Sequence, residues 1–229
     1  MSLIDEFGAL AERYLWVYRD TFGRDYPVDP LYSDAQVEAA ARHQPLLLDP
    51  EVRALYQGFP IRLVGWLEVV ALDDPFNVEA LFRQDIAGSL EHCQLAGTSW
   101  EQQWGLWPGD QPLVISDSDT QVHLVSGEPG ATRVLSYQAG YSDYPRCTVC
   151  APSLLAMLGA VVAMAETGQL EAVDNPNMPA GELLPPDPHY LGEFTDILDE
   201  YGVNEDIYIT GWAPHGGRAA FPHGNRESP

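Results

Sequence analysis

Two cysteines with C-x-x-C spacing, Cys147 and Cys150, are the residues whose spacing most directly suggests chemistry. A zinc site needs four ligands, and the adjacent pair His92 and Cys93 can be drawn as the other two, although no zinc-motif spacing supports that set. A redox dithiol needs exposure at a helix N-terminus, where the dipole lowers the thiol pKa. The helix expected after Pro152 meets this requirement in part. We expect the cysteines to be small apolar residues at a structural junction, with a metal- or thiol-dependent enzyme as the alternative.

The stretch from Asp117 to Glu128 resembles a calcium-binding loop, because Asp117, Asp119 and Gln121 stand at alternate positions. The glycine that such a loop needs at its sixth position is Val122, whose neighbours have the pattern of a strand. A turn between strands explains the aspartates better. The chain has six scattered histidines and no metalloprotease, nucleophile-elbow, phosphate-loop or dinucleotide motif. The sequence therefore predicts no catalytic residues, no metal and no cofactor.

The charge of the chain is strongly one-sided. It contains 34 acidic residues and 11 basic ones, all arginine, which gives a formal net charge of −23. Nucleic acids and anionic membranes would repel such a protein. A basic partner, a cationic ligand, metal ions or a high-salt habitat fits it better. No basic residue occurs between Arg146 and Arg218, where acids are frequent. This stretch predicts either a solvated surface that maintains solubility or a face that binds a partner.

The elements that must position these residues follow from hydrophobic periodicity and from capping residues. Helices are predicted over residues 3–22, 34–43, 50–58, 152–165 and 188–201, with a further helical piece over 76–90. Residues 61–72 predict a buried strand or strand-turn, and 111–117, 120–127, 131–138 and 206–212 predict short strands. Helices, then strands, then helices indicate an α+β fold with a mostly antiparallel sheet and helices packed against it.

The predicted organisation is one module with extensions. Residues 1–167 form an α+β module that includes an N-terminal helix, 168–213 a proline-rich linker and an acidic amphipathic helix packing on the module, and 214–229 a flexible tail. Asp5 and Glu6 stand where a secretory signal would carry positive charge, and the longest apolar run is too short to span a bilayer. A cytoplasmic protein is expected.

The order of these parts resembles the SUKH superfamily, which includes bacterial toxin-immunity proteins and relatives of a fungal cell-wall assembly regulator. The resemblance covers Ser33 to Thr167. Its marks are Glu38 on an early helix, Leu55, Tyr56 and Gly58 at the end of the next, a glycine-hydrophobic strand over 65–70, Trp104 or Trp107 before Pro112 to Asp117, and an apolar closing helix over 153–164. The pattern departs from the family at residues 43–46 and at Thr120. These are loose, fold-level motifs.

The resemblance implies a non-catalytic protein-binding module, of the immunity type, that sequesters a basic partner such as a toxin nuclease domain. A regulatory partner protein in cell-wall assembly would share the fold. The tryptophans could form a binding platform, although packing beside the sheet explains them more simply. The candidate partner-binding residues are Asp117, Asp119, Trp104, Trp107, Glu193, Asp196, Asp199 and Glu200.

Overall fold

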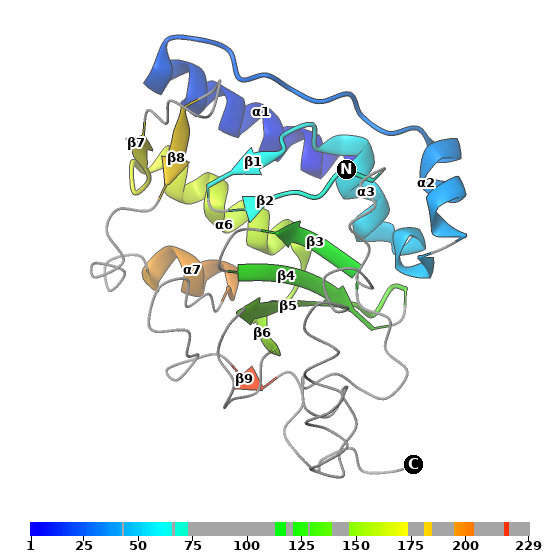
Figure 1. Ribbon diagram of the computed structural model, residues 1–229. Coiled ribbons are helices and arrows are strands. Elements are labelled where there is room, and N and C mark those ends of the chain that lie inside the picture. Colours follow the sequence, from blue (N-terminus) through cyan, green and yellow to red (C-terminus); the bar gives the residue numbers. More distant parts are fainter. Residues whose placement is uncertain are drawn as a thin grey trace.

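The computed structural model describes residues 1–42, 44–65, 67–72, 113–117, 121–127, 129–138, 147–173, 181–184, 195–203 and 218–219 (Figure 1). Helices and small antiparallel sheets make up this part of the chain. It therefore belongs to the α+β class in a broad sense, as the order of elements in the sequence predicts. None of the described helices is long and apolar enough to cross a membrane.

The described helices are α1 (Leu3–Phe22), α2 (Asp34–Ala41), the 3₁₀ helix η1 (Pro45–Leu48), α3 (Pro50–Gly58), α6 (Leu154–Glu166) and α7 (Thr195–Tyr201). The predicted bounds of α1 and α3 are confirmed, and α2 ends two residues earlier than expected. The predicted start of the last helix and the predicted helical piece over 76–90 lie outside the described residues.

Capping residues set the starts of these helices. The Ser2 hydroxyl accepts the Asp5 N–H at 3.2 Å, and the Asp5 carboxylate accepts the Ser2 N–H at 2.9 Å, which forms a capping box at α1. Gly23 ends α1 in the left-handed conformation, with φ +64°. Helix α6 begins after Ser153, whose hydroxyl accepts the Ala156 N–H at 3.0 Å. Pro152 thus precedes the cap instead of opening the helix.

Five antiparallel strands form the main sheet, in the order β3–β4–β5–β6–β9. They are β3 (Leu113–Asp117), β4 (Gln121–Ser126), β5 (Arg133–Gln138), β6 (Cys147–Ala151) and β9 (Arg218–Ala219). The strands predicted over 111–117, 120–127 and 131–138 are confirmed, whereas the one predicted over 206–212 lies outside the described residues. β9 pairs with β6 inside the stretch expected to be a flexible tail.

Helices α1, α3 and α6 lie above the main sheet, and α7 lies beside the ends of its strands (Figure 1). α1 packs along α3 and α6, and α6 contacts β6. Phe7, Tyr14 and Tyr18 of α1 are at most 2% exposed. α6 is apolar around most of its circumference and contributes many of the buried core residues, because it lies between α1 and the sheet.

A short hairpin, β1 (Leu63–Val64) and β2 (Leu67–Glu68), replaces the single long strand that residues 61–72 allowed. Gly65 makes the turn possible, since its φ is +59° and a Cβ there would lie 2.6 Å from Val161 Cγ1 of α6. The Val70 N–H donates to the Ile115 carbonyl at 2.9 Å, which joins the hairpin segment to β3.

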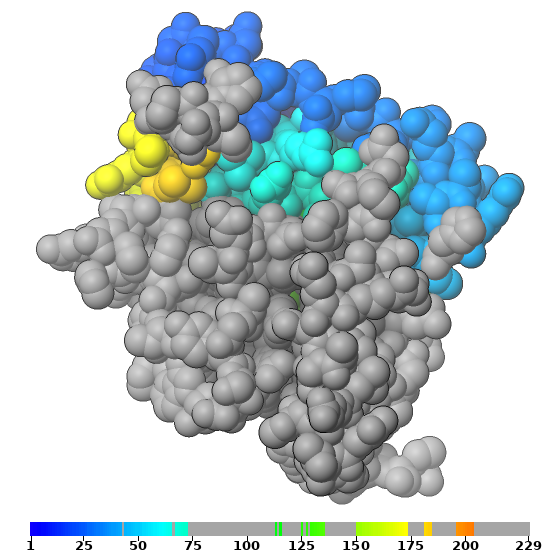
Figure 2. All heavy atoms as spheres, viewed as in Figure 1, coloured from blue at the N-terminus to red at the C-terminus, as the bar shows by residue number. Residues whose placement is uncertain are grey.

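A second hairpin, β7 (Glu171–Val173) and β8 (Glu182–Leu184), lies inside the stretch expected to be a proline-rich linker. Leu183 is 2% exposed and belongs to the hydrophobic core. Its burial explains why this part of the stretch is folded. In Figure 2 the cyan atoms of residues near β1 and β2 reach the surface between the blue helices and the yellow β7–β8 hairpin.

Candidate functional site

Helix α7 carries three of the candidate partner-binding residues on its exposed side. Asp196, Asp199 and Glu200 are exposed, whereas Leu198 is 7% exposed and belongs to the hydrophobic core. The amphipathic pattern expected for this helix is therefore confirmed where the structure describes it. The three acids lie within less than two turns of helix, so their negative charges are close together on the surface.

Close packing joins α7 to α6, and an ion pair joins α6 to α1. The Tyr201 ring lies in a notch over Gly159 of α6, where an added Cβ would be 2.7 Å from Tyr201 Cε1. Arg13 of α1 binds Glu166 of α6 through both carboxylate oxygens, with Nε–Oε1 at 2.8 Å. Its hydrogen bond lowers the pKa of Glu166, and the pKa of Arg13 is raised in return.

Helix α7 lies in a chain segment without basic residues, and none of the ion pairs between described residues involves its acids. Arg146 and Arg218 bound that segment, and Arg13 of α1 is paired with Glu166. The exposed face of α7 therefore concentrates three negative charges on one short helix. Such a surface attracts basic groups and speeds their encounter.

The structure places the other candidates only in part. Asp117 ends β3 and is the register partner of Val122 in β4. Asp119, Trp104, Trp107 and Glu193 lie outside the described residues. The three acids of α7 are thus the candidates that the described structure brings together.

The C-x-x-C cysteines belong to β6, where Cys147 is the register partner of Tyr137. Cys150 is 1% exposed, and its thiol donates to the Val134 carbonyl at 3.6 Å. A buried thiol bonded to the backbone fits the expected packing role better than the exposed position that redox chemistry needs. His92 and Cys93 lie outside the described residues, and the described ones form no cluster of three or more potential metal ligands.

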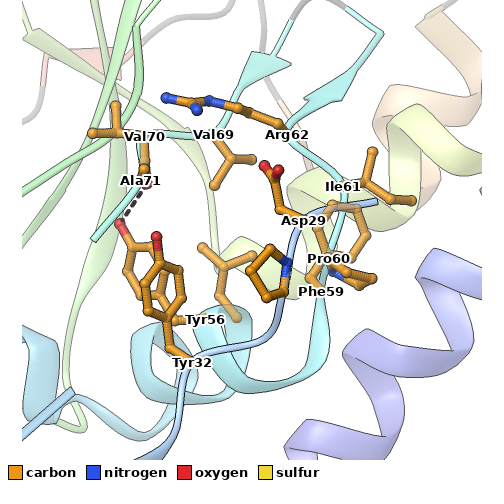
Figure 3. A pocket seen from close by; sticks show the side chains of 12 residues that line it. Asp29, Tyr32, Tyr56, Phe59, Pro60, Ile61, Arg62, Val69, Val70 and Ala71 are labelled. Carbon is orange, nitrogen blue, oxygen red and sulfur yellow. Dashed lines mark hydrogen bonds between the residues drawn. The ribbon is translucent and has the colours of Figure 1, made fainter. Parts of the chain in front are cut away.

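A pocket that the sequence did not predict lies between the chain near Asp29 and residues 69–71 (Figure 3). These residues follow β2, and the stretch from Ile61 to Leu72 is called the β1–β2 segment below. Its volume is about 40 Å³. Tyr32, Tyr56, Val69 and Ala71 line it together with parts of α3 and the chain that follows α3. In the sequence, two prolines in RDYPVDPLY marked this stretch only as a loop. A proline-rich extended segment that carries two tyrosines was the available signal.

Tyrosine hydroxyls bond the backbone of the β1–β2 segment throughout its length. The N–H groups of Leu63, Gly65 and Leu72 donate to the hydroxyls of Tyr26, Tyr14 and Tyr32 at 3.0, 3.4 and 3.2 Å. The Tyr56 hydroxyl donates to the Val70 carbonyl at 3.1 Å. Burial raises the pKa of Tyr14, Tyr26 and Tyr56 above the ordinary value of 10. These tyrosines are therefore neutral structural groups at physiological pH.

No family model matches the chain, and no curated protein matches it either.

Proposed function

We propose that this protein is a non-catalytic binding module that sequesters a basic protein partner, such as the nuclease domain of a toxin. One observation carries the proposal: the acids of α7 form an exposed negative face on a helix that packs on α6, with the Tyr201 ring over Gly159. A net charge of −23 extends the same attraction over the whole molecule.

The finer fold assignment is part of this proposal. A single SUKH-like module over residues 1–167 would use α2, α3, the β1–β2 segment, β3 to β5 and α6 in the order that the resemblance requires. The glycine of the resembling strand is Gly65, which makes the hairpin turn, and the closing helix is α6. An immunity-type module of this kind would neutralise its toxin in the cytoplasm.

The first experiment identifies the partner and measures its affinity. The full chain is cross-linked in native lysate, and the captured protein is produced separately in a catalytically inactive form for calorimetric titration. The proposal expects a basic partner whose dissociation constant rises steeply with salt, because screening weakens charge steering. A captured partner that is acidic, or binding that does not change with salt, would contradict it.

The second experiment localises the contact. The variant D196N/D199N/E200Q removes three exposed charges from α7, and we expect it to weaken binding about tenfold, mainly through slower association. The matched control E12Q/D20N/E171Q removes three exposed charges from α1 and β7. An equal loss in both variants would show that total charge, and not the α7 face, determines binding.

A further inference from the structure

The pocket near Asp29 is large enough for the terminal group of one side chain. Its volume is about 40 Å³, and a single water needs about 10–15 Å³ of free volume. Leu55, Phe59 and Ile61, each at most 6% exposed, form its apolar floor. The pocket is therefore a narrow slot for part of one extended group and is too small for a helix or a large cofactor.

Hydrogen bonds fix both walls of this slot. The Asp29 N–H donates to the Pro60 carbonyl at 2.9 Å, and the Tyr32 N–H donates to the Tyr56 carbonyl at 3.1 Å. The hydroxyls of the two tyrosines bond the opposite wall, at Leu72 and Val70. Because these hydrogen bonds turn the hydroxyls toward the backbone of Leu72 and Val70, the rings contribute most of the tyrosine surface that the walls offer to a ligand. A slot with fixed walls loses little entropy when it is filled.

The groups at the slot favour a cation on an apolar stem. The rings of Tyr32 and Tyr56 meet edge to face, with centroids 5.8 Å apart and planes at 84°. Asp29 is exposed, and Figure 3 shows its carboxylate turned toward Val69 across the pocket. Aromatic walls and a carboxylate together attract ammonium and guanidinium groups, whose methylene stems pack on the apolar floor.

Arg62 is the one cationic residue among those that line the slot. It is exposed, and Figure 3 shows it extended over Val69 toward Val70, with its guanidinium on the far side of Val69 from the Asp29 carboxylate. A zwitterionic ligand would need both Asp29 and Arg62, whereas a cationic one would be repelled by Arg62. The two ligand types therefore predict opposite effects of removing the Arg62 charge.

We propose that this slot, walled by Tyr32 and Tyr56 with Asp29 at its mouth, receives a lysine or arginine side chain of the basic partner. The inference rests on the proposed function and adds to it an anchor site separate in sequence from the α7 face. A buried cation stem would supply specificity where the α7 acids supply attraction at longer range.

The test uses single amino acid derivatives as probes. N-acetyl-arginine amide and N-acetyl-lysine amide are titrated into the isotope-labelled full chain, with N-acetyl-norleucine amide and N-acetyl-glutamate amide as controls. We expect saturable shifts of backbone amide signals at residues 29–32, 55–62 and 69–72 with the cationic probes only. Equal binding of the norleucine probe, or binding of the glutamate probe, would overturn the proposal.

Variants complete the test. D29N should weaken binding of the cationic probes by about threefold, the range of an exposed charge pair, and the matched control D20N on α1 should leave it unchanged. R62Q should bind these probes as tightly as the wild type or more tightly. Loss of probe binding in R62Q would indicate a zwitterion site and overturn the proposal, as would an unchanged affinity in D29N.

The outcome also separates this inference from the proposed function. Probe binding depends on the slot alone, whereas the D196N/D199N/E200Q variant tests the α7 face with the intact partner. If the probes bind as expected and the α7 variant keeps full affinity, the slot stands and the α7 proposal fails. If the α7 variant loses affinity and D29N does not alter probe or partner binding, the slot proposal alone fails.

Discussion

The carboxylate of Asp49 is 1% exposed, and both of its oxygens accept hydrogen bonds. Oδ1 accepts the N–H groups of Glu51 and Val52 at 2.9 and 3.1 Å, which caps α3. Oδ2 accepts the Gly130 N–H at 2.8 Å and the Thr132 hydroxyl at 3.1 Å, in the turn between β4 and β5. One side chain thus joins the helical layer to the sheet, and its four hydrogen bonds replace the water lost on burial.

Asp49→Ala should lower the free energy of unfolding by about 3 kcal/mol, because it removes a helix cap and leaves two donors of the β4–β5 turn without their acceptor. Asp49→Asn should lower it less, because the amide keeps one carbonyl oxygen. That oxygen can accept either the N–H groups of α3 or the donors of the β4–β5 turn, but not both sets. Urea denaturation followed by circular dichroism measures both, with the exposed Asp20→Ala as control. Wild-type stability in Asp49→Ala would refute the role given to this residue.

At the scale of elements, the β1–β2 segment depends on neighbours for its backbone hydrogen bonds. Its strands have two residues each, so they satisfy few of their own donors and acceptors. Tyrosines from α1, α3 and the extended chain after α1 supply the missing partners. The segment also forms one wall of the pocket near Asp29. Its stability and the shape of that pocket are therefore linked.

Alkaline pH should destabilise this arrangement. Burial raises the pKa of Tyr14, Tyr26 and Tyr56 in the folded protein, so above about pH 10 the unfolded chain loses phenolic protons that the folded protein keeps. The stabilisation is complete below that pH and is lost as pH rises further. We expect tyrosinate absorbance to appear together with loss of near-ultraviolet circular dichroism. Ordinary titration of all tyrosines in a folded protein would contradict this prediction.

At the scale of the whole molecule, excess negative charge opposes compaction. The net charge is −23 at pH 7, and the surface ion pairs that contain arginine offset only a small part of it, because exposed pairs contribute at most about 1 kcal/mol each. The hydrophobic core beneath α1 and α6 must outweigh this repulsion. Solution conditions that screen charge therefore act on the stability of the whole fold.

Added sodium chloride should raise the melting temperature. Between about 10 and 150 mM salt the Debye length falls from about 30 to about 8 Å, which weakens self-repulsion more than it weakens the Arg13–Glu166 pair. Differential scanning calorimetry over this range measures the effect. The variant E12Q/D20N/E171Q should show a smaller dependence on salt. A melting temperature that falls as salt is added would show that ion pairs dominate instead.

The sequence by itself determined the local features of this protein. Helical periodicity, the glycine stops Gly23 and Gly58 and the prolines Pro50 and Pro152 located α1, α3 and α6 to within about two residues, because these signals act between neighbouring positions. The same periodicity assigned Asp196, Asp199 and Glu200 to the exposed side of α7. The alternation of strands separated by short turns likewise indicated β3, β4 and β5.

Only the tertiary structure decided how distant residues meet. The helix that begins at Pro50 was predicted, but the bonds of Asp49 to Gly130 and Thr132 cross about eighty residues of sequence. The pocket near Asp29 and the tyrosine bonds to the β1–β2 segment likewise join separate parts of the chain. The cysteines show the same division: their spacing allowed chemistry, and the burial of Cys150 in β6 favours a packing role. Local rules fix which elements form, whereas burial and long-range hydrogen bonds fix what each side chain can do.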